Sequence, residues 1–129
     1  MRHFILILGF YFLPLPVLSA APTVSFSKEV LPILAENCFQ CHGPDDSTRE
    51  ANLRLDLFED AIRPRDGYQV IMPGNVAKSD LINRILSDDD SIKMPPTDFD
   101  KHLSKSDIVI LQNWIANGAP YEQHWSFKP

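Results

Sequence analysis

The sequence has 129 residues, the length of a single domain, and its 17 Asp and Glu residues outnumber its 12 Lys and Arg residues, giving a formal net charge of −5. This acidic balance argues against nucleic acid as a partner and favours a protein partner with a basic docking patch. The alternative explanation of a mild acidic excess is that it keeps the protein soluble and has no bearing on its partners.

The first 20 residues are predicted to be a secretory signal peptide. Arg2 supplies a basic start, residues 4–13 are almost continuously apolar, and residues 17–21 offer small side chains for cleavage after Ser19 or Ala20. An uncleaved anchor is the alternative, but the apolar run is shorter than the roughly 20 residues that a spanning helix needs. We therefore expect a mature chain that is periplasmic or otherwise exported and has no membrane span.

A first helix is predicted after Thr23, with Ser27 as its N-cap. Pro32 is compatible with this helix only near its start. Its apolar residues at helical spacing are Val30, Leu31, Ile33 and Leu34.

The predicted helix leads into Cys38-Phe39-Gln40-Cys41-His42, which contains both cysteines of the chain. C-x-x-C-H is the attachment sequence of a c-type haem. On one helical turn, positions i, i+3 and i+4 share a face, so Cys38 and Cys41 can form thioethers to the haem while His42 reaches the iron. A redox dithiol and a structural disulfide remain alternatives. Zinc is the weakest option, because it needs more ligands than this segment supplies.

The middle of the chain is predicted to contain long connections and one short helix. Residues 53–57 alternate leucine with charged residues, which suggests a strand, but beside a haem we expect an extended segment followed by a helical turn through Ala61. Residues 68–74 are predicted to be a linker, and residues 87–91 a solvated acidic loop, with calcium binding as the weaker alternative. Between them, near residues 79–86, we expect a helix whose apolar face consists of Leu81, Ile82, Ile85 and Leu86.

The last helix has the clearest end signals. Ser104 and Asp107 resemble a capping box, Leu103 can contact Ile108 as a hydrophobic staple, and Gly118 followed by Pro120 ends the helix. An apolar stripe should pack on the first helix, and its Trp114 is a candidate for bordering the haem. The stripe consists of Ile108, Leu111, Trp114 and Ile115.

The sixth ligand of the iron decides the chemistry. Met94, Met72 and His102 are the candidates, and Met94 is favoured because Pro95 and Pro96 stiffen the segment that presents it. Ligation by His42 and Met94 would leave no open position and would mean electron transfer. An open distal site would instead permit a haem enzyme or sensor.

Several segments in order resemble the planctomycete-type cytochrome c domain. They are residues 30–34 (VLPIL), 38–43 (CFQCHG), 53–56 (LRLD), 72–74 (MPG), 94–96 (MPP), 114–119 (WIANGA) and 124–127 (HWSF). The resemblance implies an all-α, cytochrome c-like helical domain with long connecting loops around one covalently attached haem c. It also implies thioethers to Cys38 and Cys41, His42 as the proximal ligand and Met94 as the distal ligand.

The resulting domain organisation is a signal peptide over residues 1–20, a cytochrome c domain over residues 24–120 and a tail over residues 121–129. In the family that the chain resembles, such a tail leads into further domains. The predicted function is that of an exported module that carries one electron between redox partner proteins. The alternatives are a haem enzyme or sensor with an open distal site, and a haem-free thiol redox module.

Overall fold

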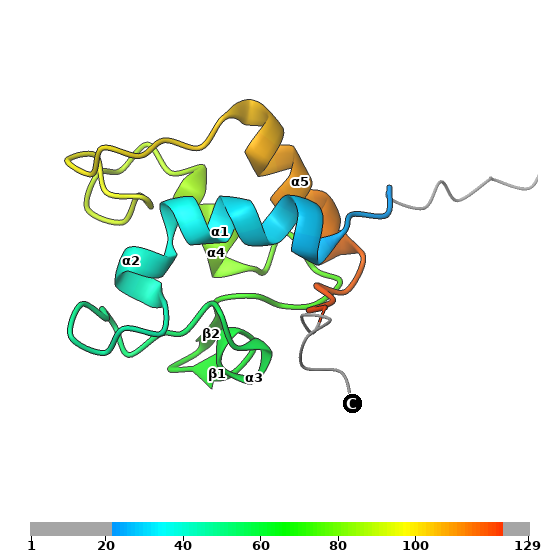
Figure 1. Cartoon of the computed structure of the whole chain (residues 1–129), viewed down its shortest axis with the longest axis horizontal. Coiled ribbons are helices and arrows are strands. Elements are labelled where there is room, and N and C mark those ends of the chain that lie inside the picture. Colours follow the sequence, from blue (N-terminus) through cyan, green and yellow to red (C-terminus); the bar gives the residue numbers. More distant parts are fainter. Residues whose placement is uncertain (1–21, 123–129) are drawn as a thin grey trace, which may run out of the picture.

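Helices joined by long loops, with one short hairpin, make up residues 22–122, which are the residues that the computed structural model describes (Figure 1). In chain order the elements are the π-helical turn η1 (Phe26–Val30), α1 (Leu31–Asn37), α2 (Phe39–His42), α3 (Phe58–Ala61), β1 (Pro64–Arg65), β2 (Tyr68–Gln69), α4 (Asp80–Ile85) and α5 (Lys105–Ala116). The prediction of a small helical domain with long loops agrees with this architecture, but an all-α fold does not include the hairpin. The predicted signal peptide and residues 123–129 of the tail lie outside the described residues.

The first predicted helix is present as η1 followed directly by α1, and Pro32 lies in the first turn of α1, where a missing N–H is tolerated. The prediction of Ser27 as the N-cap is wrong, because the helical backbone already begins at Phe26. The first N–H groups of this helix find their hydrogen-bond acceptor at the far end of the described chain. The Glu122 carboxylate accepts hydrogen bonds from the backbone N–H groups of Phe26 (3.1 Å) and Ser27 (3.4 Å).

The core joins the two ends of the described chain, because α5 packs against η1. The predicted stripe faces inward: Leu111, Trp114 and Ile115 are buried, and Ile108 is half-buried against the same cluster. The Trp114 ring lies 5.7 Å from that of Phe26, centroid to centroid, and its Nε1–H donates to the Pro120 carbonyl at 3.0 Å.

Both end signals of α5 are confirmed. The Ser104 hydroxyl accepts the N–H of Asp107 at 3.1 Å, and the Asp107 carboxylate accepts the N–H of Ser104 at 2.8 Å, which is a complete capping box. Beyond the helix, Gly118 adopts φ +94°, a conformation that favours glycine.

The hairpin between α3 and α4 occupies part of the predicted linker. Asp66 (φ +33°) and Gly67 (φ +91°) form its two-residue turn. Asp-Gly is a strong signal for such a turn, so the sequence did carry this information. The predicted helical turn through Ala61 is confirmed. The prediction of an extended segment over residues 53–57 is wrong in its second half, because residues 55–57 turn and the N–H of Leu57 donates to the Arg54 carbonyl at 3.4 Å.

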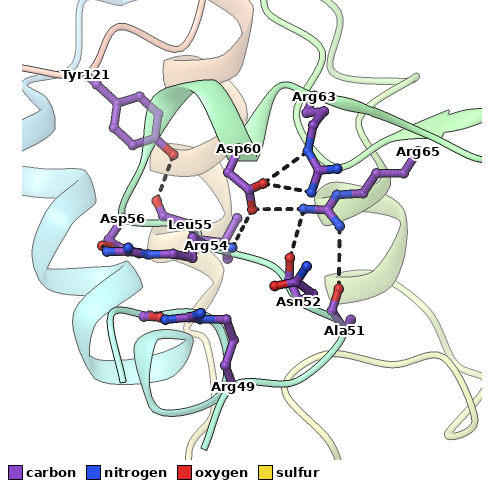
Figure 2. A network of polar contacts seen from close by, with 11 residues as sticks. Arg49, Ala51, Asn52, Arg54, Leu55, Asp56, Asp60, Arg63, Arg65 and Tyr121 are labelled. Carbon is purple, nitrogen blue, oxygen red and sulfur yellow. Dashed lines mark hydrogen bonds and ion pairs between the residues drawn. The ribbon is translucent and has the colours of Figure 1, made fainter. Parts of the chain in front are cut away.

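Asp60 in α3 ties the hairpin to the preceding segment (Figure 2). Its carboxylate accepts the N–H of Arg54 at 2.7 Å and pairs with the guanidinium groups of Arg63 and Arg65, each at 2.8 Å. Burial would raise the pKa of Asp60, but these hydrogen bonds and the two guanidinium charges lower it below its usual range. Arg65 also donates to the carbonyl of Asn52 at 3.3 Å, which fixes the course of the segment before Arg54.

Helix α4 is confirmed, with one correction to its apolar face. Leu81, Ile82 and Ile85 are buried, whereas Leu86 is 52% exposed, so the prediction for Leu86 is wrong. Leu86 lies just past the helix, at the C-cap, where the side chain no longer follows the helical face.

A substitution in α5 tests the contact between the two chain ends. Trp114→Ala should lower the free energy of unfolding by about 3–5 kcal/mol, because it opens a cavity in a fully buried position. Lys105→Ala, on the exposed side of the same helix, should change it by less than about 0.5 kcal/mol. Denaturant unfolding of the haem-loaded chain measures both, and equal effects would contradict the packing described here.

Candidate functional site

A cavity of about 480 Å³ lies between α2, α4 and the segments 50–55 and 94–99. Its volume falls in the range typical of small-molecule sites, roughly 300–1,000 Å³. Cys38, Cys41, His42 and Met94 all line it. Much of its wall is apolar and consists of Leu53, Leu55, Val70, Leu81, Ile85 and Phe99.

The two cysteines and His42 are placed by a break between two helices. The backbone at Cys38 (φ −128°, ψ −37°) leaves the α1 geometry, and α2 then begins at Phe39. The carbonyl of Cys38 accepts the N–H of Cys41 at 3.2 Å and that of His42 at 2.8 Å. The motif is therefore one helical turn, with its three chemically important side chains lining the same cavity.

Gly43 ends this turn because no side chain fits there. A Cβ atom at Gly43 would lie 2.3 Å from the carbonyl oxygen of Phe39, which belongs to the backbone and cannot move aside without distorting α2. A side chain at this position would collide with the backbone of α2, so the position requires glycine.

His42 has the environment of a metal-binding imidazole. Its Nδ1 is buried and has no hydrogen-bond partner within residues 22–122. Burial lowers the pKa of His42. The nearby backbone and the negative charge of Glu50 raise it, but burial has the larger effect. A lowered pKa favours the neutral imidazole, which is the form that binds a metal ion.

Met94 reaches the cavity from the segment that follows α4. The N–H of Met94 donates to the Arg84 carbonyl at 3.2 Å, near the end of α4. Neither Met72 nor His102, the other two candidates for the sixth ligand, is among the residues that line this cavity. His102 is exposed, and the N–H of Met72 instead binds the buried Ser79 hydroxyl at 2.9 Å.

Trp114 also does not line the cavity, so the expectation that it borders the haem is not met. Its ring packs among aromatic side chains instead, 5.7 Å from Phe26 and 5.3 Å from Tyr121 between centroids.

The residues present fit a c-type haem. Two cysteines and a histidine lie on one helical turn, the histidine carries an unpaired buried nitrogen, and a thioether lines the same largely apolar cavity. Within the described chain, no group of three or more His, Cys, Asp or Glu side chains is arranged to hold a bare metal ion.

Residues 38–98 match the family model for planctomycete cytochrome C. Over these residues, the match confirms the predicted resemblance to the planctomycete-type cytochrome c domain. It begins at Cys38 of the haem motif and extends past Met94, so the cytochrome match includes the four residues of the predicted site. No curated protein and no solved structure matches the chain.

The environment of the Cys38 thiol is not that of a reactive redox thiol. Burial, and to a smaller extent the charge of Cys41, raises the pKa of the Cys38 thiol to about 12. Reactive cysteines have lowered pKa values, because the thiolate is the nucleophile. This environment argues against the thiol redox alternative.

The cavity also contains charged residues that the sequence analysis did not single out. Glu50, Asp80, Arg84 and Asp98 line it, together with the half-exposed Tyr68. The spacing of Asp80 and Arg84 at i and i+4 predicts an ion pair on a helix, but it does not indicate that the pair faces a cofactor.

The space at Gly43 can be tested directly. Gly43→Ala should destabilise the haem-loaded chain by about 1–3 kcal/mol, because the added methyl group forces the α2 backbone to shift. Pro44→Ala, at the next and exposed position, is the control and should change thermal stability little. If both variants unfold at the temperature of the wild type, the close approach to Phe39 is not required.

Proposed function

We propose that the chain is an exported c-type cytochrome module that carries one electron through a single haem. The haem would be attached through Cys38 and Cys41 and ligated by His42 and Met94. The observation that carries this proposal is the cavity, which is lined by all four residues although Met94 lies far from the motif in sequence. The family match supports the same conclusion.

When bound, the haem supplies an iron that alternates between the ferric and ferrous states. The protein contributes the surroundings. His42 offers a neutral imidazole because burial lowers its pKa, and Leu53, Leu55 and Leu81 offer an apolar wall to the cofactor. A thioether ligand from Met94 would favour the reduced iron and leave no position for a substrate.

The placement of Met94 favours a function in electron transfer. The alternative is a haem enzyme or sensor with an open distal site. Its segment is fixed at the backbone by the hydrogen bond to Arg84, and the two prolines after it restrict its conformation. A side chain held in this way is suited to fill the sixth position of the iron. This placement supports the electron carrier over the haem enzyme or sensor.

We further propose that residues 1–20 direct export and that redox partners of the module carry a basic docking patch. None of the helices within residues 22–122 is long and apolar enough to cross a membrane. Acidic side chains near the cavity, among them Glu50, Asp80 and Asp98, would attract a basic partner. The residues after the domain, from residue 121 on, would join it to further domains of a longer chain.

Covalent attachment is tested by mass. Cys38→Ala or Cys41→Ala should reduce the fraction of the chain that keeps haem after denaturation, because one thioether is lost, and His42→Ala should remove the proximal ligand. Intact mass spectrometry of protein made with a cytochrome c maturation system measures this fraction. Gln40→Ala, in the same helical turn, is the control and should retain haem. A wild-type chain that shows only haem-free mass under these conditions would refute the proposal.

The sixth ligand is tested by comparing two methionines. Met94→Ala should lower the reduction potential and allow the reduced protein to bind carbon monoxide, because the ligand that stabilises ferrous iron is removed. Met72→Ala should do neither. Potentiometry and carbon monoxide titration separate the two variants.

The reverse result, with an effect for Met72 and none for Met94, would reassign the ligand. If neither variant differs from the wild type, neither methionine ligates the iron. If the reduced wild type itself binds carbon monoxide readily, the open-site alternative gains support.

A further inference from the structure

The charges that line the haem cavity are unevenly distributed. Three carboxylates line it, those of Glu50, Asp80 and Asp98, and Arg84 is the one lysine or arginine among its lining residues within the described chain. A haem carries two propionate carboxylates, and a carboxylate removed from water needs a cation or several hydrogen bonds. The acidic side chains would repel a propionate, so Arg84 is the favourable place for one.

The guanidinium of Arg84 is held in place and still has donors to offer. Its Nε donates to the Asp80 carboxylate at 2.6 Å, and its Nη1 donates to the carbonyl of Ile92 at 3.4 Å. A guanidinium has five N–H donors, and Nη2 makes no hydrogen bond to any residue in the range 22–122. The Nη2 side of the guanidinium therefore remains available to a carboxylate. The hydrogen bond to Asp80 already holds the guanidinium in one orientation.

Arg84 also lines the same cavity as both predicted iron ligands, His42 and Met94. Its carbonyl accepts the N–H of Met94 at 3.2 Å. The guanidinium is thus part of the wall that a haem between these two ligands would face.

Two other arginines of this region are engaged elsewhere. Arg65 pairs with Asp60 and donates to Asn52, and Arg49 donates to the carbonyls of Gly43 (3.1 Å) and Pro44 (2.8 Å). Figure 2 shows Arg65 turned toward Asp60 and the Asn52 carbonyl.

We propose that Arg84 binds a propionate of the haem, so that the cofactor is held at one edge by Cys38 and Cys41 and at another by Arg84. This inference rests on the proposed function and adds to it a residue that orients the cofactor. Because the Arg84 backbone also binds Met94, the end of α4 would hold both the propionate and the segment of the sixth ligand.

A crystal structure of the haem-loaded wild type is the direct test. One propionate oxygen should lie within hydrogen-bond distance of the Arg84 guanidinium, at about 2.7–2.9 Å. Both propionates pointing away from Arg84 would overturn the inference. Because this test needs no substitution, it remains decisive if a variant fails to mature.

Variants supply a second readout in solution. Arg84→Gln should shift the propionate bending band in the resonance Raman spectrum and lower the reduction potential, because a cation that favours ferrous iron is lost. Arg84→Lys should shift the band but keep the potential close to that of the wild type, since it retains the charge without the fork. Arg63→Gln, which removes an exposed guanidinium outside the cavity, is the matched control and should change neither.

An unchanged band in Arg84→Gln, or an equal shift in Arg63→Gln, would overturn the inference. Failure of the proposed function has a different signature, because the wild type would then hold no covalent haem at all. A wild type that holds haem, with propionates that do not contact Arg84, refutes only this inference.

Discussion

A four-residue helix leaves its last carbonyl groups without partners inside the helix, and in α2 two of these carbonyls are bound by the loop that follows. The Cys41 carbonyl accepts the N–H of Glu50 at 2.7 Å, and the His42 carbonyl accepts the N–H of Leu55 at 2.8 Å. These bonds return the chain to the haem motif, so that Leu53 and Leu55 become part of the cavity wall. The carbonyl of Leu55 in turn accepts a hydrogen bond from the hydroxyl of Tyr121 at 2.9 Å. Because the Tyr121 ring packs beside Phe26 and Trp114, this bond connects the motif to the core.

The opposite wall of the cavity is fixed in a different way. Pro95 and Pro96 have no N–H, so Met94 provides the one backbone donor of this tripeptide, and it binds the Arg84 carbonyl. The cavity is therefore made from two segments that are secured independently, one by the loop after α2 and one by the end of α4. A cofactor between them would connect both.

The sequence predicted those features whose causes lie within a few residues. The haem motif, the capping box of Ser104 and Asp107 and the glycine end of α5 are all local signals. The hairpin turn at Asp66 and Gly67 is also local, but the sequence analysis did not use this signal and assigned only the second strand, residues 68–69, to a linker. The proline-stiffened segment led to Met94 as a site residue, and its place on the cavity is compatible with that prediction.

Features that depend on distant partners were not predictable in this way. The start of the first helix could not be located at Phe26 from local sequence, because Glu122, almost 100 positions away, satisfies its N–H groups. From the sequence, Arg84 is expected to form an ordinary surface ion pair with Asp80. Only the packing of α4 places it on the cavity. Leu86 continues the apolar spacing of α4, but the helix ends before it.

The contact of Glu122 with η1 has a mechanical consequence. The side chain of Asn117 also donates to the Pro22 carbonyl at 2.7 Å, so the entry and exit of the described chain meet at one edge. A tensile force applied between these two points would act first on the Glu122 and Asn117 hydrogen bonds. Tyr121, next to Glu122, donates to the Leu55 carbonyl in the cavity wall, so these hydrogen bonds at the chain ends would take the load before it reached the haem cavity.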